Sequence, residues 1–408
     1  MTAGSRGDVA PYTGLGQGLC RAGHEVTLVT HARFEYLVAG SGVAFRPLPV
    51  DPRAELESVR GRGLHRSASG VGKLVRVAEM ARRLVGRMTD DLVAAARGSD
   101  VLLLSGAVAP LGHAIADGLS LPSMGVYLQP LTPTREFAPP VLGGGSWGGA
   151  GNRFAGHGVS LAVEQIFAAA VPEVRARLGA PPKRLGTARR ARARGWTIQH
   201  GFSPLVVPRP RDWRAGLDVC GYWWPYDAAA GLPRDVRDFL DAGPAPVFVG
   251  LGSATVPDAG RLSEQVVTAL RRAGLRGVVQ QGWGGLAADG DDMLTIGEAA
   301  HSALFPRMAA VVHHAGAGTT AAGLRAGVPA VPVPIQFDES FWSARLVDLG
   351  VAPAAVPLRG LTTDTLSAAL VRATREPAFA DRARQLGARI RAEDGVAPVL
   401  AALDRLAE

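Results

Sequence analysis

Two adjacent histidines end an apolar run in a pattern that suits the binding of a diphosphate. His313 and His314 are followed by the small-residue turn Ala315–Gly318 and by a pair of threonines. A turn that opens a helix exposes backbone N–H groups at the positive end of the helix dipole, where a phosphate binds well. Imidazole and hydroxyl groups add donors to the same oxygens. The alternative is an ordinary capped helix with core-facing histidines. The candidate residues are His313, His314, Gly316, Gly318, Thr319 and Thr320.

Acidic residues stand at two other turns. Asp338 and Glu339 follow the apolar run that ends at Pro334, and ligands of open α/β sheets bind beyond the carboxyl ends of strands. A carboxylate accepts hydrogen bonds from sugar hydroxyls, so the pair is a candidate sugar-binding element, although Asp338 could instead cap a helix. Asp8 ends the turn Gly4–Asp8, and a lone aspartate in a glycine turn is more often a turn former than a catalytic group.

Strand-like and helix-like segments alternate in both halves of the chain. In the first half we expect strands at 26–30, 101–104 and 124–128 and helices at 15–22, 74–96 and from 112 onward. In the second half we expect strands at 246–253, 277–281, 293–296, 309–313 and 330–334 and helices at 262–273 and 319–326. This alternation predicts an α/β fold with parallel sheets. A single core rarely exceeds ~250–300 residues, so 408 residues predict two domains.

Three stretches depart from this rhythm. Only Met1–Ala3 precede the turn at Gly4, so a central first strand is either very short or begins before the sequence given. The stretch Gly143–Gly151 reads GGGSWGGAG, and its glycines predict no regular element, only a mobile loop or lid or a plain linker. The proline-rich stretch Pro204–Trp213 predicts the connection between the two domains.

Composition narrows the class of protein. With 47% hydrophobic and 20% charged residues the chain is globular rather than disordered. The chain has 44 Lys and Arg against 36 Asp and Glu, and arginines are concentrated at Arg60–Arg87 and Lys183–Arg194. A solvated surface is the favoured interpretation; no nucleic-acid partner is expected, and peripheral membrane contact is left open. Cys20 and Cys220 show no metal or disulfide spacing, and no apolar run nears the ~18–20 residues of a membrane span, so we expect a cytoplasmic protein.

Metal and nicotinamide chemistry are not expected. The acids of Asp289–Asp292 are similar to an acid-x-acid element by which another class of sugar transferases holds a divalent cation. A glycine-rich loop surrounds them, however, so a solvent turn is the better interpretation. The sequence has no Gly-x-Gly-x-x-Gly turn with a following acid, which a dinucleotide-binding half would need.

Four motifs in order resemble one known family. They read GSRGDVAPY near the start, FSPLVVPRPRDW in the middle, then FPRMAAVVHHAGAGTT and FDESFW. Together they are similar to the antibiotic and sterol glycosyltransferases of families 1 and 28, whose GT-B fold has two facing Rossmann-like domains. The resemblance implies an acceptor domain over residues 1–208, a linker over 209–222, a nucleotide-sugar domain over 223–380 and C-terminal helices over 381–408 that pack back on the N-terminal domain.

The same resemblance implies residue roles. His314 and Thr319 would contact the phosphates with help from Gly316, Gly318 and Thr320, while Ser253 and Ser5 would approach the diphosphate from the two domains. His301 lies in the stretch that packs on the nucleotide base, although Ala300 stands where most relatives have proline. Glu339 stands where relatives carry glutamine, and glutamate cannot donate as glutamine does. Asp8 would be the general base, with His24 and His31 as the nearest histidine alternatives.

We therefore expect an inverting, metal-independent glycosyltransferase. The co-substrate would be a UDP- or dTDP-sugar, with no other cofactor, and the acceptor a small, largely apolar alcohol or phenol such as a natural product or sterol. The alternatives are a transferase for a membrane lipid acceptor, a non-catalytic partner protein that keeps the nucleotide-sugar fold, and a nucleotide-sugar epimerase. The sequence leaves open the acceptor, the nucleotide base, the sugar and the oligomeric state.

Overall fold

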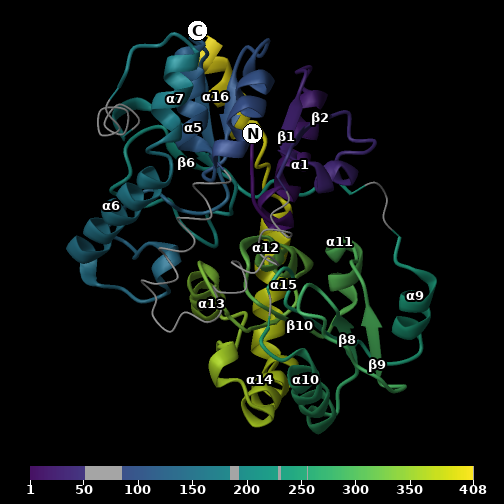
Figure 1. The fold of residues 1–408 in the computed structure, drawn as a ribbon. Helices are drawn as coiled ribbons and strands as arrows, with labels where there is room; N and C mark the ends of the chain where they lie inside the picture. Colours follow the sequence, from purple (N-terminus) through teal and green to yellow (C-terminus); the bar gives the residue numbers. More distant parts are fainter. Residues whose placement is uncertain (51–84, 184–192, 228–230, 255, 408) are drawn as a thin grey trace.

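The computed structural model describes residues 1–50, 85–183, 193–227, 231–254 and 256–407. Within them the chain forms two α/β units, one above the other in Figure 1, with the N-terminal half at the top and the C-terminal half below. This is the two-domain α/β fold expected from the sequence. Most of the two arginine-rich stretches, Arg60–Arg87 and Lys183–Arg194, lies outside the described residues.

The N-terminal sheet is parallel and contains two groups of strands. β1 (Thr27–His31) pairs with β2 (Ala44–Leu48). The second group has the order β3 (Leu102–Leu104), β4 (Ser123–Tyr127), β5 (Ile198–His200) and β6 (Leu217–Val219). Parallel neighbours require crossover connections, which include α1 (Ala10–Arg21) and α5 (Ala109–Gly118).

The first residues of the chain lie between these two groups. The Thr2 N–H donates to the Val29 carbonyl of β1 at 3.0 Å, and the Met1 amine donates to the Leu103 carbonyl of β3 at 2.8 Å. The Ser105 N–H in turn donates to the Met1 carbonyl at 3.1 Å. The short first segment therefore occupies the centre of the N-terminal sheet and delivers the turn at Gly4 directly to its carboxyl edge.

The expectation for the glycine-rich stretch was wrong in part. Gly148 begins α6 (Gly148–Ile166), so the end of this stretch is helical rather than irregular. The Asn152 amide explains this, because its Oδ1 accepts from the Trp147 N–H at 2.8 Å and its Nδ2 donates to the Arg135 carbonyl at 3.1 Å. Close packing contributes as well, since a Cβ on Gly156 would lie 2.8 Å from Pro133.

The C-terminal sheet has five parallel strands. Their order is β11 (Ala330–Pro332), β10 (Ala310–His313), β7 (Val247–Gly250), β8 (Gly277–Gln280) and β9 (Met293–Ile296). All residues of β7, β8, β10 and β11 are buried, as expected for apolar runs in a sheet covered on both faces. α10 (Ala259–Ala273) begins where the Asp258 carboxylate caps the Arg261 N–H and ends at the left-handed Gly274.

The remaining described elements complete the two domains. They are η1 (Arg6–Asp8), η2 (Ala32–Leu37), η3 (Pro140–Leu142), α7 (Ala170–Arg177), α9 (Arg234–Asp241), α11 (His301–Leu304), η4 (Phe305–Arg307), α12 (Ala317–Ala326), α13 (Glu339–Asp348), η5 (Leu358–Gly360), α14 (Thr363–Arg375), α15 (Pro377–Arg391) and α16 (Ala397–Ala407). Residues 85–96 are also helical. Thr362 caps α14, which packs on α10.

The last two helices divide between the domains. α15 packs on α12, and its buried Leu386 and Ile390 join a cluster that contains Trp342. α16 instead places Val399 and Leu403 in the core of the N-terminal domain. The chain crosses between them at Glu393 and Gly395, where the Ser203 hydroxyl donates to the Glu393 carboxylate at 2.6 Å and the Trp223 indole donates to the Gly395 carbonyl at 2.8 Å.

The stretch expected to link the two domains contains a strand. β6 lies inside the 209–222 range expected as the linker, and it forms the edge of the N-terminal sheet beside β5.

Among the described residues, no single helix has the length and apolar character needed to cross a bilayer. α6 and α7 meet that test only as a pair bent by 55°.

Candidate functional site

The turn between β10 and α12 combines unusual backbone geometry with an open helix end. Ala315 adopts φ 63°, a left-handed conformation that is costly for a residue with a side chain and recurs at functional sites. Gly316 is the N-cap of α12, and no side chain caps this helix. The first N–H groups of α12 are therefore free of side-chain partners and carry the positive end of the helix dipole, as an anion site requires.

His314 is held between two glycines at this turn. A Cβ on Gly316 would lie 2.4 Å from Nε2 of the imidazole, and a Cβ on Gly252, which has φ +58°, would lie 2.8 Å from its Cε1. The absence of both side chains lets the turn after β7, which carries Ser253, lie directly beside the ring. Burial lowers the pKa of His314 to about 4, so the ring is neutral at pH 7 and donates through one nitrogen.

His313 lies deeper and has a different environment. It is 1% exposed, and its Nδ1 accepts the Ala315 N–H at 3.1 Å. Burial, followed by the neighbouring His314 and His301, lowers the pKa of His313 to about 3, so this neutral ring carries its proton on Nε2. The structure thus gives His313 a direct part in holding the left-handed turn. Thr320 is also buried, at 1% exposed, whereas Thr319 is half-buried and Gly318 is exposed.

Asp8 is organised by its own turn. Its Oδ2 accepts the Ser5 N–H and the Ser5 hydroxyl, both at 2.9 Å, and the Gln129 side chain also donates to the carboxylate. Gly4, at φ 140°, is required here because a Cβ would lie 2.5 Å from Oδ2. Burial raises the pKa of Asp8 despite these hydrogen bonds, and a higher pKa makes a carboxylate a stronger base.

The two histidine alternatives occupy structural positions. His31, at the end of β1, accepts the Gly4 N–H at 3.0 Å through Nε2 and is 2% exposed. His24 is exposed in the turn after α1. His31 therefore positions the turn that carries Asp8, and His24 lies away from it in the connection to β1.

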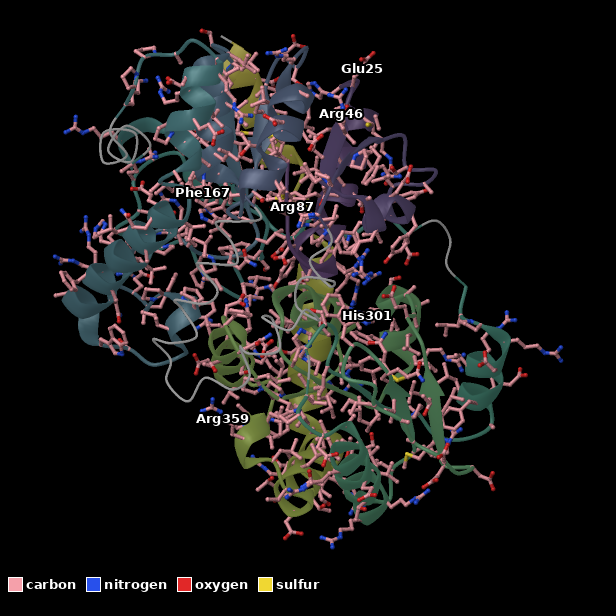
Figure 2. The ribbon with its side chains drawn as sticks, in the orientation of Figure 1. Glu25, Arg46, Arg87, Phe167, His301 and Arg359 are labelled. Atoms are coloured by element: carbon pink, nitrogen blue, oxygen red, sulfur yellow. The ribbon has the colours of Figure 1, made fainter. Side chains whose placement is uncertain are left out.

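The two domains bring their candidate residues together. η1, which contains Asp8, packs against α12, and Figure 1 shows the purple N-terminal segment descending onto that helix. The charge of Asp8 contributes to raising the pKa of Asp338, after burial, and the charge of Arg6 contributes to lowering the pKa of His301. Figure 2 places His301 at the level where the two domains meet. The boundary between the two domains thus has the segment that carries Asp8 on one side and the helix with the open N-terminus, α12, on the other.

The Asp338–Glu339 pair is split between two environments. The Asp338 Oδ2 accepts the Trp342 indole N–H at 2.7 Å rather than capping α13. Glu339 turns back on its own loop, where Oε2 accepts the Ile335 N–H at 2.5 Å and the Gln336 N–H at 2.7 Å. Burial raises the pKa of Glu339 to about 7. Asp338 is therefore the acid nearer to Asp8, and Glu339 fixes the loop that presents it.

His301 belongs to an aromatic cluster. Its ring stacks on Phe305 at 4.2 Å between centroids and meets Phe248 edge-on at 5.8 Å. Burial, followed by the charges of Arg6 and His314, lowers the pKa of His301 to about 3. The ring is thus a neutral, flat surface beside the domain boundary, an environment that suits packing against a nucleotide base.

Sequence reasoning missed a set of contacts that join η2 to the C-terminal domain. The Tyr36 hydroxyl donates to Glu298 at 3.3 Å, and the Arg33 guanidinium lies 5.4 Å from the centre of the Trp283 ring. We call these four residues the interdomain clasp. No motif marks them, because each pair joins positions about 250 residues apart.

The acids at 289–292 lie in an exposed turn, as expected, with Asp292 paired to Arg271 at 2.9 Å.

Two facing domains, each built on a parallel sheet with flanking helices, are the architecture of the GT-B class of fold. Residues 1–116 match the family model of the glycosyltransferase family 28 N-terminal domain, and residues 285–405 match that of the C-terminal domain of erythromycin biosynthesis protein CIII-like proteins. The whole chain is 36% identical over 418 residues to O-mycaminosyltylonolide 6-deoxyallosyltransferase of Streptomyces fradiae and covers 97% of it.

Sterol enzymes and solved structures give the same result. The chain is 33% identical over 422 residues to a sterol 3-beta-glucosyltransferase of Candida albicans, with 97% of this chain aligned but only 27% of the length of that relative. The structure of the glycosyltransferase VinC in complex with DTDP aligns with 99% of this chain and 98% of its own, with a TM-score of 0.65 and 22% identity. The chain belongs to the family of antibiotic and sterol glycosyltransferases.

Proposed function

We propose that this chain transfers a sugar from a UDP- or dTDP-sugar to a hydroxyl of a small, largely apolar acceptor, with inversion at the anomeric carbon and without a metal ion. The observation that carries the proposal is the packing of η1, which contains Asp8, on α12, whose uncapped N-terminus follows His314 in the chain. An acceptor oxygen needs a base and a leaving diphosphate needs positive groups; Asp8 would supply the first, and His314 with the N-terminus of α12 the second.

The donor would occupy the C-terminal wall. Its diphosphate would receive hydrogen bonds from the first N–H groups of α12, from the neutral His314 and from Thr319, with Ser253 and Ser5 approaching from the two sides. The nucleotide base would pack near His301, and the sugar would lie towards Asp338, whose Oδ2 is held by the Trp342 indole N–H. The named ligand of the solved structure VinC, DTDP, supports a nucleoside diphosphate at this wall.

The reaction itself would be a single displacement. As the acceptor oxygen bonds to the anomeric carbon, its proton passes to the Asp8 carboxylate, and the bond from that carbon to the diphosphate breaks with its electron pair leaving on the diphosphate. Ser5 holds the Asp8 carboxylate through Oδ2, so the orientation of the base is set before the acceptor arrives. The names of the relatives, which include a tylonolide and sterols, support an apolar alcohol as the acceptor class.

The test is product formation with a chelator present. Purified protein would be incubated with UDP- and dTDP-sugars and with macrolide and sterol alcohols, and the products analysed by mass spectrometry and by the anomeric coupling in NMR. Transfer with inversion is expected, unaffected by the chelator and slowed by about a hundredfold or more in Asp8→Asn. Transfer with retained anomeric configuration, or activity that the chelator abolishes, would overturn the mechanism, and a folded protein without any transfer would overturn the function.

A further inference from the structure

Helix α6 carries a row of large apolar side chains that point into solvent. Trp147, at its N-cap, is 57% exposed, Phe154 is 82% exposed and Leu161 is 46% exposed. They are spaced by seven residues, which is two helical turns, so they form one stripe along the helix. Among the exposed large hydrophobic residues of the described chain, these three are the set that lies on a single helix.

The opposite face of α6 is firmly attached to the protein. Asn152, Ala155 and Gly156 are buried, and Asn152 bonds to both Trp147 and Arg135. Figure 1 shows α6 at the outer left edge of the molecule with no other labelled element beyond it. The stripe is thus the outward face of a helix whose inward face is buried against the rest of the protein.

The charge around the stripe has one sign. From residue 137 to residue 163 the sequence contains no Asp or Glu, and the exposed charged or titratable groups of this part of α6 are Arg153 and His157. Glu164, the acid that follows, is buried at 4% exposed. The chain as a whole carries a net charge of +8. An apolar stripe with the exposed Arg153 beside it, and no Asp or Glu from residue 137 to residue 163, matches an anionic lipid surface, where the apolar side chains enter the headgroup boundary and the guanidinium remains outside.

The position of α6 connects this face to the candidate site. η3, which leads into α6, packs on α13, and the ring of Phe137 lies 5.3 Å from that of Phe341 in α13. Asp338 immediately precedes α13. The segment that leads into α6 therefore contacts the helix that follows Asp338.

We propose that the Trp147–Phe154–Leu161 face of α6 docks the protein on the surface of a bilayer that contains anionic lipid. Docking is an interfacial contact of one helix face, and it adds to the proposed transfer reaction without depending on it. The chemistry that recognises this face is the combination of exposed acyl-chain boundary and negative headgroups, which neither a neutral bilayer nor a free anion offers.

Vesicle co-sedimentation tests the proposal, without donor or acceptor. The probes are vesicles of phosphatidylcholine alone and of phosphatidylcholine with phosphatidylglycerol. Wild type is expected to sediment with the anionic vesicles, and Phe154→Ser to reduce the partition coefficient by about tenfold or more, the loss expected for one large apolar side chain. Arg153→Gln is expected to reduce it by a few-fold and to weaken its dependence on salt.

Matched controls distinguish docking at this face from a general loss of apolar surface or of folding. Val347→Ser, which removes an exposed apolar side chain on α13, is expected to bind vesicles as wild type does. Phe154→Ser is expected to keep the melting temperature and the turnover of a water-dispersed acceptor, because the side chain is exposed and lies outside the catalytic residues. Absence of wild-type binding to anionic vesicles, or equal binding by Phe154→Ser, would overturn the proposal. A wild-type dimer that Phe154→Ser converts to a monomer, without vesicle binding, would assign the face to a second copy instead.

Discussion

At the scale of single residues, Asp8 combines a raised pKa with a fixed orientation. Ser5 donates twice to Oδ2, and His31 holds the Gly4 N–H one residue earlier. Asp8→Asn preserves the shape and can still accept from Ser5, but it cannot take a proton. We expect kcat to fall by roughly 10²–10⁴-fold, the usual contribution of a general base. The dissociation constant for a nucleoside diphosphate, measured by calorimetry, is expected to stay within about two-fold because no donor contact is lost.

The same carboxylate sets the acid limb of the rate profile. A raised pKa means that Asp8 is protonated, and inactive as a base, up to a higher pH than an ordinary aspartate. The rate at saturating substrate should therefore rise with pH through an apparent pKa above the usual aspartate range, and this limb should be absent from the residual rate of Asp8→Asn. The same acid limb in wild type and variant would contradict the assignment of Asp8 as the base.

His314 is expected to act on binding more than on the proton transfer. Its neutral ring lies against the open end of α12, so His314→Ala removes one hydrogen bond to a charged group and leaves a gap between Gly252 and Gly316. A loss of about ten- to a hundred-fold in affinity for the nucleoside diphosphate is expected. His24→Ala, at an exposed histidine in a turn, is the matched control and should bind as wild type. Unchanged affinity in His314→Ala would remove this residue from the donor site.

At the scale of elements, the loops that follow β10 and β11 share a construction. Each contains a non-glycine residue in the left-handed region, Ala315 in one and Phe337 at φ 51° in the other. Each is held by a side chain that accepts backbone N–H groups, His313 in the first loop and Glu339 in the second. The strain is thus balanced by hydrogen bonds to a side chain at the end of β10 in the first loop and at the start of α13 in the second.

The second of these loops should make stability depend on pH. The Glu339 pKa rises from 4.5 to about 7 on folding, so below 4.5 the group is protonated in both states and costs nothing. Between pH 4.5 and pH 7 the Glu339 carboxyl ionises only in the unfolded chain, so the free energy of unfolding falls as pH rises. Above pH 7 the carboxyl is ionised in both states, and the loss of stability is complete. Glu339→Gln keeps an oxygen for both N–H groups. Relative to wild type it should gain about 1–3 kcal/mol in free energy of unfolding between pH 5 and pH 8. Urea unfolding of both proteins at these pH values measures it, and a difference that does not change with pH would contradict it.

The sequence predicted every strand of the C-terminal sheet because buried parallel strands are continuous apolar runs, but it missed β2, β5 and β6 in the N-terminal domain. The run from Val247 to Gly250, for example, lies where it was expected, and so does the turn after His313. The sequence analysis failed at α6, where the glycine content predicted an irregular loop. Glycine propensity opposes a helix by only about 1 kcal/mol per residue, and the Asn152 hydrogen bonds and the close approach of Gly156 to Pro133 outweigh it. Such tertiary contacts leave no local pattern.

At the scale of the whole molecule, contacts across the domain boundary were the part that the sequence could not predict in detail. The helical end was expected to return to the N-terminal domain from family resemblance, but the separate destinations of α15 and α16 follow from packing around Trp342 in one case and Trp223 in the other. Asp8 was identifiable only through its motif. Its electrostatic coupling to Asp338, 330 residues away, depends on how the two sheets face each other.

The interdomain clasp gives the last prediction. Tyr36 and Glu298 hydrogen-bond across the boundary, so removing either partner should shift the domains away from the closed arrangement and lower the competent fraction that binds donor. The pair is largely exposed, so Tyr36→Phe and Glu298→Ala should each weaken nucleoside diphosphate binding by only a few-fold, with a coupling below about 1 kcal/mol. The double variant should bind the nucleoside diphosphate as well as either single variant does, because each single change already removes the Tyr36–Glu298 hydrogen bond. Calorimetric titration of the four proteins measures the cycle, and strictly additive losses would show that each side chain acts through another contact.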